Sequence, residues 1–226
     1  MTADPDPPDA AADVAFDAVV LAGGRASRLG TPKPGLVVAG RPLLDHALAA
    51  TSGARARVVV GPDDLADPER YALTREDPPF GGPVAGIAAG LAALPATPDD
   101  GPAPWVLVLA CDVPQAATMV PLLLAALASP DGDGPGVDGS GADAGADPVD
   151  AVRAVRGGRD QWLVGLYRRS ALDAAVERLR ADGGVDGAPA HRLLCGLVAR
   201  TVEDDEGLTA DVDTWQDAHE HDRRPR

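Results

Sequence analysis

A short segment near the N-terminus combines paired glycines with basic side chains. Residues 21–33 read LAGGRASRLGTPK, in which Gly23 and Gly24 precede Arg28 and Lys33. Glycines let backbone N–H groups approach a ligand closely, and the two cations bring positive charge over the same loop. The segment has neither the Lys-Ser or Lys-Thr ending of a P-loop nor the G-x-G-x-x-G of dinucleotide folds. It predicts a phosphate-binding loop, and an ordinary glycine turn with solvated basic residues is the alternative.

A second candidate for chemistry is Asp112, which follows the apolar run 105–110. In open α/β sheets the carboxyl ends of the strands face the ligand crevice. A carboxylate at that point is well placed to hold a hard cation between the protein and a phosphate. A helix N-cap or a turn aspartate ahead of Pro114 is the alternative.

Two further carboxylates, Asp211 and Asp213, lie near the end of the chain. Alternate residues of an extended stretch share a face, so the pair could complete a second metal position. An N-cap role for Asp213 before a terminal helix is equally open. No ligand spacing occurs among the histidines, and we expect no histidine base; they are His46, His191, His219 and His221.

The apolar runs predict the elements that must position these residues. Strands are expected at 16–21, 57–60, 73–76, 105–110, 151–155, 161–167 and 199–202. Helices are expected at 43–50, 84–94, 118–127, 170–181, 189–197 and from about 214, and a short extended stretch at 35–44. Alternating strands and helices predict the α/β class, with a three-layer arrangement. A mostly parallel, twisted sheet would be covered by helices on both faces.

The length and composition predict one catalytic domain. The chain has 226 residues, of which 45% are hydrophobic and 24% charged, enough for a single sizeable core. We expect a disordered N-terminal tail at 1–14, the domain at 15–218 and a charged C-terminal tail at 219–226. The stretch 129–148 is rich in Gly, Asp, Ala and Pro, and it predicts a flexible surface insertion because it cannot bury much apolar surface.

The charge and the N-terminal sequence exclude several classes of partner. A net charge of −15 argues against binding to nucleic acid or to an anionic membrane. No apolar run preceded by basic residues begins the chain, so neither a signal peptide nor a membrane anchor is expected, and the prediction is a cytoplasmic protein. The cysteines, Cys111 and Cys195, have no partner nearby in sequence and are expected to be reduced core residues.

Four blocks of the sequence together resemble a known family. They are LAGGRASRLGTPKPGL at 21–36, REDPPFGGPVAGIAAGL at 75–91, VLVLACDVP at 106–114 and ADVDT at 210–214. The chain is similar over nearly its whole length to nucleotidyltransferases with an LAGG-x-x-x-R-x-G signature, among them the molybdenum cofactor guanylyltransferases. Related cytidylyltransferases usually have LAAG in the first block and a serine-containing segment in the second. The resemblance implies a Rossmann-like nucleotidyltransferase fold and a preference for guanine.

The resemblance also implies roles for particular residues. It makes Lys33 a phosphate ligand and Asp112 the Mg²⁺ ligand. Together with Arg28 of the glycine loop they are the expected catalytic set, and Asp213 is the further metal candidate. Where the family often has asparagine this chain has Gly61, so a backbone contact alone is implied there. The spacing to Lys33 is one residue shorter than in the common pattern, and Pro32 replaces an acidic neighbour. Together with the glycine turns, the nucleotide-binding residues expected are Leu21, Ala22, Gly23, Gly24, Lys33, Gly61, Asp77, Gly82 and Asp112.

The reaction implied is transfer of GMP from GTP to the phosphate of the molybdopterin cofactor, with release of pyrophosphate. Mg²⁺ is the implied cofactor, and GTP and a molybdopterin-type phosphate acceptor are the implied partners. Transient contact with molybdoenzymes or other cofactor-synthesis proteins would follow from the use of the product. The alternatives are a related nucleotidyltransferase of cytidylyl or sugar-phosphate type, and a non-catalytic regulatory domain that binds a nucleotide.

Overall fold

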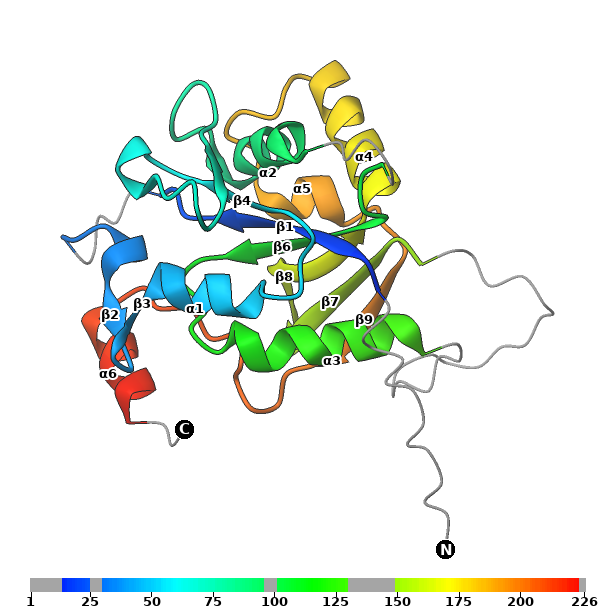
Figure 1. Ribbon diagram of the computed structural model, residues 1–226. Coiled ribbons are helices and arrows are strands. Elements are labelled where there is room, and N and C mark those ends of the chain that lie inside the picture. The colour runs from blue at the N-terminus through cyan, green and yellow to red at the C-terminus, as the bar shows by residue number, and fades with distance from the viewer. Residues whose placement is uncertain (1–13, 25–29, 96–100, 130–148, 224–226) are drawn as a thin grey trace, which may run out of the picture.

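The computed structural model describes residues 14–24, 30–95, 101–129 and 149–223. Within these residues seven strands form one sheet in the order β5-β4-β1-β6-β8-β7-β9 (Figure 1). Neighbouring strands run parallel except for β8, which is antiparallel to both β6 and β7. The strands are β1 (Phe16–Leu21), β4 (Arg57–Val60), β5 (Ala72–Thr74), β6 (Trp105–Ala110), β7 (Ala151–Arg156), β8 (Arg159–Arg168) and β9 (Ala199–Glu203).

Helices cover both faces of this sheet, which confirms the predicted three-layer α/β class. One face packs against α1 (Leu43–Ala50) and α3 (Ala116–Ala128). The other packs against α2 (Gly82–Ala93), α4 (Arg169–Ala181) and α5 (Ala190–Leu194). The central strands are apolar on both sides because both sides are buried: in β1, Ala18 and Val20 face one core and Val19 faces the other.

Helix α2 lies unusually close to the sheet. A Cβ added at Gly90 would lie 2.4 Å from Val19 Cγ1 on β1, so only glycine permits this approach. Most residues of α2 are glycine or alanine, and seven residues of the helix are buried. This close contact fixes the N-terminal end of α2 beside the carboxyl ends of β1 and β4.

The C-terminal segment folds back over the beginning of the chain. Helix α6 (Trp215–Asp222) packs on a short hairpin made by β2 (Val37–Val38) and β3 (Arg41–Pro42), where Val212 and Ala218 join a small third core. The N-cap of α6 is Thr214, which forms a capping box with Asp217, so the alternative N-cap role for Asp213 is wrong.

Some element boundaries differ from those expected. Helix α6 continues to Asp222 and buries His221, so the folded part of the chain extends beyond the boundary expected at 218. The stretch 35–44 holds the end of the 3-10 helix η2 (Lys33–Gly35), the β2–β3 hairpin and the start of α1. Cys111 is buried as expected, but Cys195 is exposed, which corrects its expected place in the core.

The expected tail 1–14 and the insertion 129–148 fall almost wholly outside the described residues. Ser129, at the start of that insertion, is the C-cap of α3. A helix long and apolar enough to cross a membrane is absent from the described part of the chain.

Candidate active site

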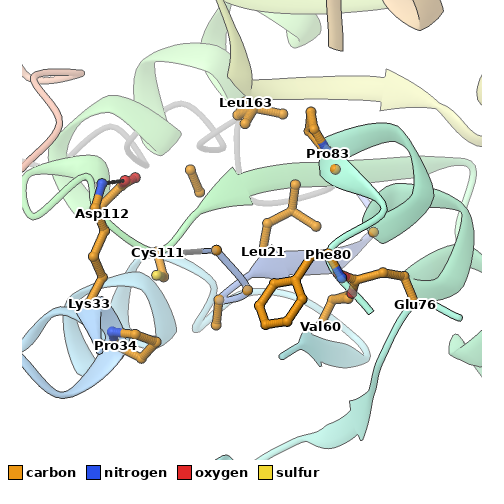
Figure 2. A pocket seen from close by; sticks show the side chains of 16 residues that line it. Leu21, Lys33, Pro34, Val60, Glu76, Phe80, Pro83, Cys111, Asp112 and Leu163 are labelled. Atoms are coloured by element: carbon orange, nitrogen blue, oxygen red, sulfur yellow. Dashed lines mark hydrogen bonds and ion pairs between the residues drawn. The ribbon is translucent and has the colours of Figure 1, made fainter. Parts of the chain in front are cut away.

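A cavity of about 410 Å³ opens at the carboxyl ends of β1, β4 and β6 (Figure 2). This is where parallel α/β sheets place their ligands. Among the described residues its lining comes from the end of β1 with residues 22–24, residues 33–34, Val60 at the end of β4, the segment from 76 into α2, residues 110–112 at the end of β6, and Leu163 on β8. An adjoining cavity of about 530 Å³ shares the glycine loop and is also lined by Gly61, Arg75 and Asp64.

The start of the glycine loop is held between two neighbouring strands. The Ala22 N–H donates to Val60 O at 2.8 Å, and the Cys111 N–H donates to Leu21 O at 3.0 Å. Gly24 has a φ of 152°, a backbone conformation that residues with a side chain rarely adopt, so glycine suits this position of the loop. Leu21, Ala22, Gly23 and Gly24 all line the cavity. Residues 25–29 lie outside the described residues, so the role of Arg28 stays a prediction.

Lys33 connects two carboxylates from distant parts of the chain. Its Nζ donates to Asp112 Oδ2 at 2.7 Å and to Asp213 Oδ1 at 2.5 Å. Burial lowers the pKa of Lys33, but the charge of Asp112 and the hydrogen bonds to Asp112 and Asp213 outweigh it and raise the pKa above its usual range. Lys33 therefore remains a cation at every physiological pH. Burial raises the pKa of Asp112, and the Lys33 ammonium opposes that rise.

A backbone contact explains how Asp213 reaches this place. The Val212 N–H donates to Asp112 O at 2.9 Å, which ties the segment before α6 to the end of β6. Val212 itself is fully buried. Asp211 lies 3.7 Å from an Arg156 nitrogen, and its charge helps to raise the pKa of Asp112. Residues 210–213 belong to no strand of the sheet, and a metal position shared by Asp211 and Asp213 stays a prediction.

The carboxylates of Asp112 and Asp213 fit a hard divalent cation. Their oxygens converge on one positive centre, the Lys33 Nζ, and carboxylate oxygen is the ligand type that Mg²⁺ prefers. No cluster of three His, Cys, Asp or Glu side chains suited to a metal occurs in the described ranges, so further ligands would come from phosphate oxygens and water. The N-cap alternative for Asp112 is wrong because Gln115 is the N-cap of α3.

The opposite part of the cavity holds residues that sequence reasoning missed. Glu76 and Phe80 line both cavities, whereas Asp77, the predicted nucleotide contact, is exposed and lines neither. Gly82 lines the first cavity and Gly61 the second, at their expected positions. No spacing in the sequence separates Glu76 from its acidic neighbour, because the direction of each side chain depends on how the turn is folded.

The sheet, the glycine loop and the Lys33–Asp112 pair define the class of this protein, which is a nucleotidyltransferase. Residues 18–194 match the family model described as the MobA-like NTP transferase domain. The chain belongs to this family, and the resemblance seen in the four sequence blocks is confirmed.

Similar proteins cover almost the whole chain. A molybdenum cofactor guanylyltransferase from Cupriavidus necator is 30% identical over 213 residues, which are 91% of this chain and 96% of that protein. The solved structure of the molybdopterin-guanine dinucleotide biosynthesis protein A from Archaeoglobus fulgidus is 21% identical, with a TM-score of 0.59 and coverage of 91% of this chain and 96% of that one. The 2-C-methyl-D-erythritol 4-phosphate cytidylyltransferase from Thermus thermophilus is 18% identical, with a TM-score of 0.62 and coverage of 92% and 97%. The fold alone therefore does not distinguish a guanine from a cytosine nucleotide.

Proposed function

We propose that this protein is a molybdenum cofactor guanylyltransferase, which transfers GMP from GTP to the terminal phosphate of molybdopterin and releases pyrophosphate. The observation that carries the proposal is the grouping of the glycine loop, Lys33, Asp112 and Asp213 at one end of a nucleotide-sized cavity. The guanylyltransferase relative that aligns with 91% of the chain supports the choice of GTP and of the acceptor.

The proposed chemistry needs no nucleophile from the protein. A phosphate oxygen of the acceptor attacks the α-phosphorus of GTP, a new P–O bond forms, and the bond to the β-phosphate oxygen breaks as pyrophosphate leaves with its electron pair. Cys111 lines the cavity, but burial raises the pKa of its thiol, which keeps it protonated. Among the described residues that line the two cavities there is no histidine that could act as a base.

Catalysis then consists of positioning and charge neutralisation. Lys33 would move from the carboxylates to the phosphates of GTP, and the backbone N–H group at Gly24 would donate to a phosphate oxygen. Asp112 and Asp213 would hold Mg²⁺, which supplies charge neutralisation for the α-phosphate and the leaving pyrophosphate. Arg28 would add a second cation from the same loop.

The same proposal covers the partners and the location. With a net charge of −15, the protein offers no general field that attracts nucleic acid or an anionic membrane. A cytoplasmic location and brief contacts with molybdoenzymes or other proteins of cofactor synthesis would suit an enzyme that must hand on its product.

Pyrophosphate release tests this proposal directly. The purified protein is incubated with Mg²⁺ and GTP, ATP or CTP, with and without molybdopterin. We expect release that requires both GTP and molybdopterin, with GTP preferred by about two orders of magnitude or more because the wrong base leaves buried hydrogen-bonding groups unpaired. Asp112→Asn is the control, and it should remove turnover while the protein still unfolds in one cooperative transition in urea.

Two outcomes would favour the alternatives. Equal or better use of CTP would make the protein a cytidylyltransferase. Tight binding of GTP without pyrophosphate release under any condition would indicate a regulatory nucleotide-binding domain.

A further inference from the structure

The main cavity has two chemically different ends. Figure 2 shows the Lys33–Asp112 pair on one side of Leu21, and Glu76 and Phe80 on the other. The first end suits phosphates and a cation. The second end offers one carboxylate, one aromatic ring and the apolar side chain of Val60. A nucleotide whose phosphates lie near Lys33 would place its base toward this second end.

The Glu76 carboxylate is fixed over the glycine loop. A Cβ added at Gly23 would lie 3.9 Å from Glu76 Oε1 and 4.0 Å from Oε2, so the carboxylate stands in contact distance of the loop that opens the cavity. The Phe80 N–H donates to Oε1 at 3.0 Å, which holds the carboxylate of the residue four positions earlier in place. Each carboxylate oxygen has two lone pairs, so Glu76 can still accept hydrogen bonds from a ligand.

A carboxylate at the base end distinguishes between bases by charge and by hydrogen bonding. Guanine carries two adjacent donors on one edge, N1–H and N2–H₂, and the two oxygens of a carboxylate can accept from both. Adenine presents the acceptor N1 on the corresponding edge, and cytosine presents the acceptor N3. Either acceptor facing a carboxylate would place two lone pairs together and leave a partly buried charge unpaired.

We propose that Glu76 is the residue that selects guanine, by accepting hydrogen bonds from N1–H and N2–H₂ of the base. This inference rests on the proposed use of GTP and goes further, because it assigns base choice to one side chain. It also differs from the expectation drawn from the sequence blocks, in which Asp77 contacts the nucleotide. Glu76 is half-buried in the cavity wall, whereas Asp77 is exposed outside it.

The test is a change of base preference on Glu76→Gln. An amide at this position accepts from N1–H through its oxygen and donates through its nitrogen, so it complements xanthine, which has N1–H beside the acceptor O2. Binding of GTP, ITP and XTP to the full chain is measured by calorimetry in Mg²⁺. The parent should favour GTP over ITP, which lacks the N2 amino group, by about tenfold or more. Glu76→Gln should weaken GTP by about tenfold to a hundredfold and bind XTP better than the parent does.

Two further variants make the result specific. Glu177→Gln makes the same chemical change on the exposed surface of α4, and it should leave all three affinities within about twofold. Asp77→Asn tests the rival carboxylate. The proposal is overturned if Glu76→Gln keeps the parental order of GTP, ITP and XTP, or if Asp77→Asn rather than Glu76→Gln shifts it. If the parent itself binds ATP or CTP as tightly as GTP, the proposed function fails and the role of Glu76 fails with it.

Discussion

The Lys33 bridge makes a measurable prediction about stability in the absence of any ligand. Lys33→Met removes the ammonium and keeps most of the aliphatic length, so packing changes little while two charged hydrogen bonds disappear. The side chains of Lys33 and Asp112 are 23% and 19% exposed, but that of Asp213 is 46% exposed. The two arms of the bridge should therefore contribute unequally to the free energy of unfolding.

The size of each contribution follows from exposure. A largely buried hydrogen bond to a charged group contributes roughly 1.5–3 kcal/mol, part of which is offset by the cost of burying the ions. Solvent screening reduces a half-exposed ion pair to about 1 kcal/mol or less. Because Lys33→Met also leaves the Asp112 carboxylate buried and unpaired, we expect this variant to lose roughly 1–3 kcal/mol of stability. Asp213→Asn alone should lose about 1 kcal/mol at most.

Urea unfolding of single and double variants gives the coupling of each pair. The double-mutant cycle of Lys33 with Asp112 should give a coupling free energy of about 1 kcal/mol or more, and the cycle of Lys33 with Asp213 should give a clearly smaller one. In pyrophosphate release, Lys33→Met should lower turnover by about a hundredfold or more, since a cation at the phosphates is lost. An unchanged or higher stability of Lys33→Met, or an equal coupling of both pairs, would refute the reasoning from burial.

Three further predictions concern other parts of the chain. Gly90→Ala should lower the free energy of unfolding in urea by roughly 1–3 kcal/mol, because its Cβ would lie 2.4 Å from Val19 Cγ1. Adding Val19→Ala should recover part of this loss. A parental unfolding midpoint for Gly90→Ala would contradict the close packing. Burial alone would raise the pKa of Asp204, but hydrogen bonds from the Thr209 hydroxyl and N–H and from the Leu208 N–H lower it. The contribution of Asp204 to the free energy of unfolding is therefore present above the unfolded pKa and is lost as the pH falls below about 4. In Asp204→Asn the free energy of unfolding should fall less steeply with decreasing pH in this range, and an unchanged slope would disprove the reasoning. Deletion of 131–147 should leave GTP affinity within about twofold, and its collapse in calorimetry would assign the segment to the site.

The fold was predictable from the sequence because its central strands are buried on both faces. Runs such as Trp105–Ala110 are apolar at every position, which indicates a parallel sheet between two helical layers. Family membership was also predictable, since blocks such as 21–36 and 106–114 combine residue types that occur together for chemical reasons. The reversed direction of β8 also had a local signal, since Gly157 and Gly158 lie between two apolar runs and both adopt the positive φ of a two-residue hairpin turn.

The composition of the site was only partly predictable. Lys33 and Asp112 stood out because each follows a recognisable motif, and the structure brings them to 2.7 Å from one another although 79 positions separate them. Asp213 was expected only as a possible metal ligand together with Asp211, and its pairing with Lys33 was not expected. Its place beside Lys33 depends on the Val212 N–H bond to the end of β6, a long-range contact that no local pattern reports.

The sequence by itself determined the α/β fold class, the family and two parts of the candidate site. These parts are the glycine loop with its lysine and the aspartate at the end of a strand. These are encoded locally, because strand burial and loop flexibility depend on consecutive residues. Only the tertiary structure decided which carboxylates meet at Lys33 and that Glu76, and not Asp77, faces the cavity. Side-chain direction in a turn is set by packing and backbone hydrogen bonds between distant segments, so neighbouring acidic residues that are equivalent in sequence become different in space.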